Sequence, residues 1–378
     1  MITNPAVATE VGGPSLASDS DGPCAGEHGA ASSIRWPRLL AAVALLTATA
    51  CSSLTDAERE PPARDRYRLL FFHTPPAARL GQLALLEPED GRVTLLPVSP
   101  GAFDNLRSSP DGRKLLFTRT AGAEAPGVYV MNVEGSELRP LPNVGAGYAW
   151  SPDGTRIASL IAVNAGTRFV RITDAQGAVQ VDFPHVRADH SRPSWSPDAA
   201  GLVFAGDVRH DGWLPDLFVA ASDGSRIANL SSTPGYEWEP AWSPTGSAIA
   251  FFAIRDGVVG LFSMRPDGTA IRLLYPGAEN VGLRWAPDGS KLLFTGPGAR
   301  EFESRLLVLN ADGRTRVLAS GALEGLSAAW SPDGRWVAFA KRGAEGHNIY
   351  LVRPDGSGLR EVTPGAVQGR SPVWVAAR

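Results

Sequence analysis

The chain has 378 residues, of which 20% are charged, and its formal net charge is −3. This balance gives no basic surface for nucleic acid and no polybasic segment for an acidic membrane surface. The 41 glycines and 31 prolines indicate many turns, because an apolar fraction of 43% is ordinary for a folded protein. Both cysteines, Cys24 and Cys51, precede the repeats described below, so we expect no disulfide and no cysteine-based zinc site in the folded part.

Residues 1–50 have the pattern of an N-terminal extension followed by a secretory signal peptide. Arg35 and Arg38 precede an apolar run at residues 39–50. The run is too short for a stable membrane-spanning helix, and a basic segment before such a run is typical of a secretory signal. The small residues before Cys51 resemble a bacterial lipobox, which implies that Cys51 is lipidated and becomes the first residue of the mature protein. The alternative is an ordinary signal peptide with an incidental cysteine.

Residues 51–65 are expected to form a polar tether, stiffened by Pro61 and Pro62. The lipobox resemblance implies export across the inner membrane and a lipid-anchored place in the periplasm or at the cell surface. Ser52, where aspartate would be an inner-membrane retention signal, favours the outer membrane if the envelope has two membranes.

Residues 66–378 are predicted to form one domain of repeats, each marked by the sequence motif WSPDG or a variant of it, here called a word. Proline sets φ for the second position of a tight turn and glycine accepts positive φ, so the word encodes a chain reversal. Copies or partial copies occur at residues 108–112, 150–154, 195–198, 242–246, 285–289, 330–334 and 371–374. Their first tryptophan, or its equivalent, recurs in steps of 42, 45, 47, 43, 45 and 44 residues. This period is typical of propeller blades.

A second marker keeps the same period. A glycine in a polar turn between two apolar runs occurs at Gly91, Gly135, Gly177, Gly224, Gly268, Gly313 and Gly356. Such turns indicate β-hairpins. Together with apolar, often β-branched or aromatic runs on both sides, the two markers predict four strands per unit.

The fold class is therefore predicted to be all-β, a seven-bladed β-propeller. The first unit, from Tyr67, lacks an innermost strand, and the strand containing residues 371–374 is left over at the other end of the chain. We expect the C-terminal strand to complete the first blade, because closure leaves no unpaired sheet edge. A six-bladed ring, with the divergent first unit misread, is the alternative.

The WSPDG word, with the apolar strands and DGS-like hairpins that follow it, resembles the TolB-type propeller repeat, also called WD40-like or PD40. The resemblance covers about residues 66 to 378 and implies the fold. It does not imply an activity, because similar repeats occur in periplasmic TolB, in prolyl-oligopeptidase-like enzymes and in many bacterial surface proteins. TolB has a separate α/β domain and six blades, so a TolB-like role in a Tol-Pal-type envelope assembly is only an alternative hypothesis.

No catalytic motif stands out. The sequence has no GxSxG elbow and no HExxH, EF-hand or Walker pattern. The recurrent aspartates of the SPDG words are predicted to shape turns, and the recurrent tryptophans to pack between adjacent blades.

One cluster of loop residues is a candidate site. Histidines and acids gather in HVRADH (185–190) and GDVRHDGW (206–213), on loops that a four-stranded blade places on the same face, and an acidic, aromatic segment enters the next blade beside them. The candidates are His185, Asp189, His190, Asp207, His210, Asp211, Glu237, Trp238 and Glu239. They are interpreted either as a ligand or divalent-metal site or as solvated loop residues, since no spacing matches a stringent metal pattern.

The preferred hypothesis is a non-enzymatic, envelope-anchored scaffold without a cofactor, binding a protein or glycan partner through its loop face. The alternative from another class is a metal-dependent polysaccharide lyase, which would require His185, His190 and His210 to meet at one point.

Overall fold

The computed structural model describes residues 67–75, 78–164, 167–188, 191–208, 215–231, 235–277, 282–300, 303–323, 328–343, 346–363 and 369–377. These residues form strands and turns, and none of them is helical. They all belong to the compact unit Glu60–Arg378. The predicted signal peptide, Cys51 and the tether lie outside the described residues.

The described strands form seven antiparallel sheets, and each sheet is one blade. Blades are numbered here along the chain, and strands within a blade are counted outward from the centre of the ring. Blade 1 consists of β29 (Gly369–Ala376), β1 (Tyr67–His73), β2 (Gln82–Leu86) and β3 (Val93–Leu95), and blade 2 of β4 (Gly101–Ser108), β5 (Lys114–Gly122), β6 (Gly127–Asn132) and β7 (Arg139–Pro140). Blade 3 consists of β8 (Ala146–Trp150), β9 (Arg156–Asn164), β10 (Thr167–Asp174) and β11 (Val179–Phe183).

In blade 4 the innermost strand is split, because two short segments both pair with the second strand. The blade consists of β12 (Arg187–Ala188), β13 (Ser194–Trp195), β14 (Gly201–Asp207), β15 (Asp216–Ala221) and β16 (Ile227–Asn229). Blade 5 consists of β17 (Tyr236–Trp242), β18 (Ile249–Arg255), β19 (Val258–Met264) and β20 (Arg272–Pro276). Blade 6 consists of β21 (Arg284–Trp285), β22 (Lys291–Pro297), β23 (Ser304–Asn310) and β24 (Thr315–Gly321), and blade 7 of β25 (Ala329–Trp330), β26 (Val337–Arg342), β27 (His347–Val352) and β28 (Arg360–Glu361).

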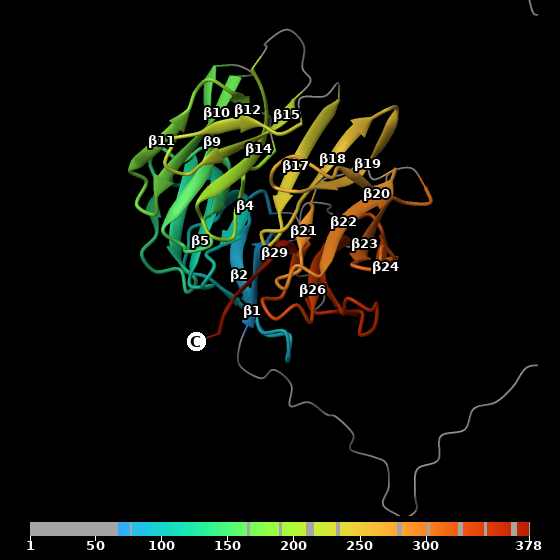
Figure 1. The fold of residues 1–378 in the computed structure, drawn as a ribbon. Coiled ribbons are helices and arrows are strands. Elements are labelled where there is room, and N and C mark those ends of the chain that lie inside the picture. Colours follow the sequence, from blue (N-terminus) through green and yellow to red (C-terminus); the bar gives the residue numbers. More distant parts are fainter. Residues whose placement is uncertain are drawn as a thin grey trace, which may run out of the picture. The chain divides into compact units, whose positions relative to one another are not determined.

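The predicted seven-bladed propeller is confirmed, and the six-bladed alternative is wrong. The predicted closure is confirmed as well. The C-terminal strand β29 pairs antiparallel with β1, with Leu69 opposite Trp374 and Leu70 opposite Val373. Figure 1 shows the red C-terminal strand beside the blue N-terminal one. The first blade therefore takes its innermost strand from the far end of the chain.

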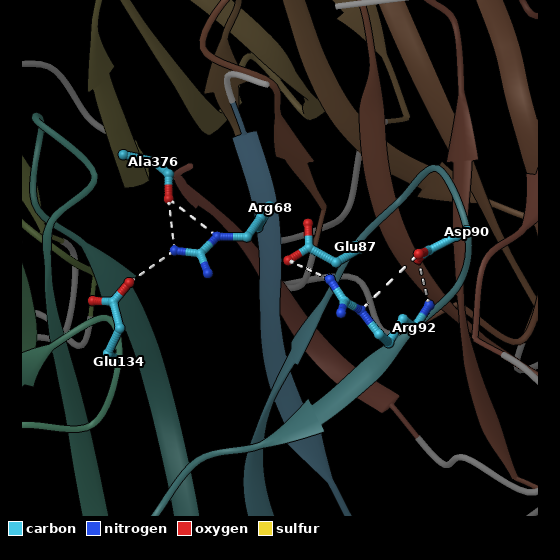
Figure 2. A network of polar contacts seen from close by, with 6 residues as sticks. All are labelled: Arg68, Glu87, Asp90, Arg92, Glu134 and Ala376. Atoms are coloured by element: carbon cyan, nitrogen blue, oxygen red, sulfur yellow. Dashed lines mark hydrogen bonds and ion pairs between the residues drawn. The ribbon is translucent and has the colours of Figure 1, made fainter. Parts of the chain in front are cut away.

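A buried arginine stabilises the pairing of β1 with β29 (Figure 2). The Arg68 side chain, 7% exposed, pairs with Glu134 of the β6–β7 turn in blade 2 at 2.9 Å. The same guanidinium donates to the backbone carbonyl of Ala376, with Nη2 at 3.2 Å. Hydrogen bonds to a charged, largely desolvated group are stronger than those between neutral groups. Arg68 thus joins the first strand, the last strand and the neighbouring blade. The second pair in the same view, Arg92 with Glu87 at 3.9 Å, lies on an exposed turn and contributes little.

The recurrent tryptophans link adjacent blades, as predicted. In blades 4, 6, 7 and 1 the indole Nε1 of this tryptophan donates to the backbone carbonyl of the residue that precedes the equivalent tryptophan in the previous blade, whereas Nε1 of Trp150 and of Trp242 has no hydrogen-bond partner among the described residues. The pairs are Trp195 to Ala149 at 3.1 Å, Trp285 to Ala241 at 3.0 Å, Trp330 to Arg284 at 3.3 Å and Trp374 to Ala329 at 3.1 Å. Each such indole buries a large apolar surface and also satisfies a carbonyl of the neighbouring sheet.

The SPDG words form the turns between the first and second strands. In blade 3, the Ser151 hydroxyl donates to Asp153 at 2.5 Å and accepts from the backbone N–H of Arg156 at 2.9 Å. The same serine–aspartate bond recurs in blade 4 between Ser196 and Asp198 at 2.5 Å, and this bond lowers the pKa of Asp198. The aspartates are occupied within their own turns, which confirms their predicted structural role.

We expect Trp374→Ala to lower the free energy of unfolding by about 3–5 kcal/mol, because it removes a buried ring at the closure of the propeller. Trp374→Phe keeps most of the buried ring and loses only the indole N–H, so its cost should be about 1 kcal/mol. Urea denaturation followed by circular dichroism measures both. Equal stability of wild type and Trp374→Ala would contradict the structural role of this residue.

Candidate functional site

The candidate loop residues of blade 4 lie only partly within the described ranges. His185 is exposed and precedes β12. Asp207, the last residue of β14, is 4% exposed and lies opposite Arg187 in the sheet register. Asp189, His190, His210 and Asp211 lie outside the described residues. Within the described ranges, no group of three or more histidine, cysteine, aspartate or glutamate side chains is arranged to hold a metal ion. The convergence of the three histidines stays a prediction.

The structure places Glu237, Trp238 and Glu239 in three different environments, although the sequence suggested one acidic, aromatic patch. Trp238 stacks on Phe252 with ring centroids 5.8 Å apart, as part of a core cluster. Glu237 is 0% exposed, whereas Glu239 is half-buried near two arginines of other blades. Of the three, Glu239 is the residue whose charge acts on Arg192 and Arg284.

Glu237 belongs to a buried ion pair. Its carboxylate pairs with Arg255 at 2.5 Å and accepts a hydrogen bond from the Ser231 hydroxyl at 2.5 Å. Ser231 Oγ in turn accepts from the backbone N–H of Leu217 in blade 4 at 2.9 Å. Burial raises the pKa of Glu237, and the hydrogen bond from Ser231 and the charge of Arg255 act in the opposite direction. Glu237 therefore connects blades 4 and 5.

A β-bulge separates the two glutamates. Residues two apart on a regular strand share a face, but the register of β17 shifts between Trp238 and Ala241, and Glu239 has φ of 50°. Bulges bend a strand and re-aim its side chains. Positive φ also occurs at Asn105, Gly147 and Ser371. Each of these residues lies three positions before the recurrent tryptophan, or its equivalent Ser108, of its innermost strand. The bulge is thus a feature of the repeat.

The innermost strands surround a cavity of about 350 Å³ at the centre of the ring. Residues of β4, β21, β25 and β29 line it, together with Arg192 of blade 4. Because these strands come from blades 1, 2, 4, 6 and 7, the cavity can only be the central channel. It is called the channel below.

Three arginines give the channel its charge. Arg107, Arg192 and Arg284 line it and are each half-buried. Burial lowers the pKa of Arg192, while Glu239 and Asp104 act in the opposite direction. Burial, followed by repulsion from Arg192, lowers the pKa of Arg284 to about 9, and Glu239 partly offsets this. Placing the positive charges of Arg192 and Arg284 close together and partly out of water therefore costs free energy, through desolvation and through electrostatic repulsion.

The guanidinium groups of the channel have few partners. Arg107 and Arg284 each donate to a carbonyl next to them in sequence, that of Leu106 at 2.6 Å and that of Leu283 at 2.8 Å. Arg192 makes no hydrogen bond or ion pair with any described residue, and its two carboxylate neighbours act on it only through their charge. Arginine forks bind carboxylates and phosphates bidentately. The arrangement can therefore hold an anionic group.

Sequence reasoning missed the channel, although a signal was present. The residue directly before each recurrent tryptophan, or before its equivalent Ser108, is small or apolar in most units. Examples are Ala149, Ser194, Ala241, Ala329 and Val373. Arg107 and Arg284 are the two exceptions at this position. Comparing the repeats position by position would have found both arginines. Glu239 occupies the bulge position and Arg192 the corresponding position between β12 and β13, and nothing in the sequence indicates either local geometry.

The family model "TolB beta propeller domain", PD40, matches residues 147–378. The chain belongs to this family. In the part of the chain that the structure describes, no helix has the length and apolar character that crossing a membrane requires.

Two curated relatives of this PD40 protein illustrate how widely the repeat is used. The uncharacterized peptidase YuxL of Bacillus subtilis is 29% identical over 150 residues, which cover 39% of this chain and 21% of YuxL. The Tol-Pal system protein TolB of Gluconobacter oxydans is 36% identical over 84 residues, 21% of this chain and 18% of that protein. The chain thus matches about a fifth of the length of each relative.

Solved structures share the propeller fold at low identity. The periplasmic gluconolactonase PpgL of Pseudomonas aeruginosa has a TM-score of 0.56 and 17% identity, with 83% of this chain and 100% of that chain covered. An oligogalacturonate lyase in complex with manganese has a TM-score of 0.55 and 16% identity, with 83% and 98% covered. Identities this low show the fold alone. The PD40 fold therefore serves enzymes and non-enzymes, and the activity has to be argued from the site.

We expect Glu237→Gln to lower the free energy of unfolding by about 3 kcal/mol, because it leaves the charge of Arg255 without its buried partner. Glu239→Gln, two residues away on the same strand, should cost less, at most about 1 kcal/mol, because Glu239 is half-buried and acts on Arg192 and Arg284 only through its charge. Urea unfolding at pH 7 compares the two variants. Equal stabilities would mean that Glu237 has no structural role.

Proposed function

We propose that this protein is a non-enzymatic, envelope-anchored scaffold that binds a protein or glycan partner by seating an acidic group of the partner in the channel. The observation that carries the proposal is the group formed by Arg107, Arg192 and Arg284, none of which has an ion pair within 4 Å among the described residues. This proposal places the acidic group at the channel, whereas the sequence-based hypothesis placed the partner on the loop face.

The balance of charge supports an anionic ligand. Asp104 and Glu239 compensate part of the three arginine charges, which leaves one net positive charge around the channel. Bringing a carboxylate to Arg192 and Arg284 would relieve their mutual repulsion and replace water with a charge-assisted hydrogen bond. Interactions in a concave, low-dielectric site are stronger than those on an open surface. A carboxylate of an acidic peptide segment or of a uronic acid fits this chemistry.

The envelope location is the second part of the proposal. The signal-like residues 1–50 and Cys51 support export and lipid anchoring. Two similar proteins have names that place them in the same surroundings, a Tol-Pal system protein and a periplasmic gluconolactonase. An envelope partner is therefore the natural candidate for the acidic group.

Crosslinking tests the channel. A photo-crosslinking benzoylphenylalanine placed at Ala329 in the channel wall should capture a partner in envelope fractions, whereas the same group at Val179, 45% exposed on an outer strand, should not. Arg192→Gln combined with Arg284→Gln should reduce the captured species by about tenfold or more, because two charged hydrogen-bond donors are removed.

Arg314→Gln, at a side chain 88% exposed on a turn of blade 6, is the matched control and should leave the yield unchanged. Mass spectrometry identifies the captured species. A yield that does not depend on the two channel arginines would refute the proposed site.

Cys51→Ala should release the protein from the membrane fraction into the soluble fraction, because the variant lacks the thiol that carries the acyl chains. Fractionation with immunoblotting measures the distribution, and Cys24→Ala serves as the control that should remain membrane-bound. Continued membrane association of Cys51→Ala would rule out this anchor.

A further inference from the structure

A second concavity lies away from the channel, at the turns of blades 6, 7 and 1. It has a volume of about 700 Å³. Its walls include Trp336 and Asp333 of the SPDG turn of blade 7, Asp355 of the next hairpin and Glu89 of the corresponding hairpin in blade 1. These turns all lie at the same end of the blades, here called the turn face. The cavity is called the turn-face pocket below.

Positive charge predominates in this pocket. Five basic side chains line it, Lys291, Arg316, Arg335, Arg353 and Arg360, against three acidic ones. Two of the carboxylates are engaged by their own turns. Asp333 accepts from Ser331 Oγ at 2.6 Å, and Asp355 accepts from the backbone N–H and the hydroxyl of Ser357 at 2.8 Å and 2.6 Å. The acids therefore shape the turns more than they neutralise the basic residues.

Trp336 holds two of the arginines in place. The guanidinium carbons of Arg353 and Arg360 lie 5.2 Å and 5.7 Å from the centre of its ring, within cation–π distance. The chain passes closely beside this ring at Gly358, where a Cβ atom would be 3.1 Å from Trp336. The indole is thus fixed by packing and supports both arginines. Stacked arginines lose less conformational freedom when they bind a ligand.

Three arginines of the pocket have no salt-bridge partner. Arg316, Arg353 and Arg360 form no ion pair within 4 Å and donate no side-chain hydrogen bond to a described residue. They come from neighbouring blades and face one concave space, so their donors can converge on one ligand. A single carboxylate is satisfied by one bidentate arginine, whereas phosphate carries up to two charges and three free oxygens and accepts from several.

We propose that the turn-face pocket binds a phosphate-bearing ligand, held by Arg316, Arg353 and Arg360 around Trp336. This site is independent of the proposed role of the channel, because its arginines are different ones, although Trp374 lines both cavities. The phosphate can belong to a free phosphorylated molecule or to a lipid headgroup, and the experiment below separates these sources.

Inorganic pyrophosphate and vesicles of phosphatidylglycerol in phosphatidylcholine are the two probes, titrated by calorimetry and by vesicle co-sedimentation. The wild-type protein should bind at least one of them, more weakly as salt increases. Arg353→Gln combined with Arg360→Gln should weaken this binding by about tenfold or more. Binding of pyrophosphate assigns the site to a free phosphate ligand, and binding of vesicles alone assigns it to a lipid phosphate.

The chain offers a matched control. Arg265 occupies the same place in the same RPDG turn of blade 5 as Arg353 does in blade 7, but Ala248 stands where blade 7 has Trp336. Arg265→Gln also removes an exposed charge and should leave binding unchanged. Failure of both probes to bind, or equal losses in Arg265→Gln and in Arg353→Gln/Arg360→Gln, would overturn the proposal. Crosslinking from the channel is a separate readout, so either proposal can fail alone.

Discussion

The propeller depends on the pairing of β29 with β1. Each of the other blades is built from one continuous stretch of chain, but blade 1 takes its innermost strand from residues that follow all the others. The pairing leaves no sheet edge exposed at the junction. Arg68 reinforces it by joining both strands and the turn of blade 2. The interface between blades 7 and 1 contains Trp374 of β29, and this residue also lines both the channel and the turn-face pocket.

The architecture could be predicted because the same local structures recur in most blades. A tight turn places proline and glycine at fixed positions, and four of the junctions between blades contain a tryptophan ring that also donates a hydrogen bond. Trp285 and Trp330 do so in the same way in adjacent blades. Because these local signals repeat, they could be recognised in the sequence, and their spacing indicated the number of blades.

The candidate sites were less predictable, since they depend on departures from the repeat. Glu237 and Glu239 look alike in the sequence, but a bulge at Glu239 puts one carboxylate in a buried ion pair and the other near the channel. Of the residues at equivalent bulges, only Gly147 is a type that favours positive φ strongly, so the sequence does not reveal the bend. Similarly, Arg353 and Arg360 become neighbours of Trp336 only when the β27–β28 hairpin folds beside the SPDG turn of blade 7.

The residues that shape the SPDG turns are thus different from the residues that we propose bind a ligand. The serine and aspartate of an SPDG turn are bonded to each other, while the side chains that project from neighbouring positions vary from blade to blade. A ring built this way can accept substitutions beside the turn of one blade with little effect on the junctions of the others.

The ring has one interruption in its covalent chain, and it falls where other blades have an SPDG turn. Tyr67 and Ala376 lie directly opposite each other in the register of β1 and β29, at the position that such a turn would join. Ala376 N–H also donates to the carbonyl of Gly112, in the SPDG turn of blade 2, at 3.0 Å. The closure of blade 1 therefore rests on strand pairing and needs no covalent connection at this position. A circular permutant that links these two residues through a designed SPDG segment and opens at another such turn would preserve every strand pairing, with the termini moved to a different blade.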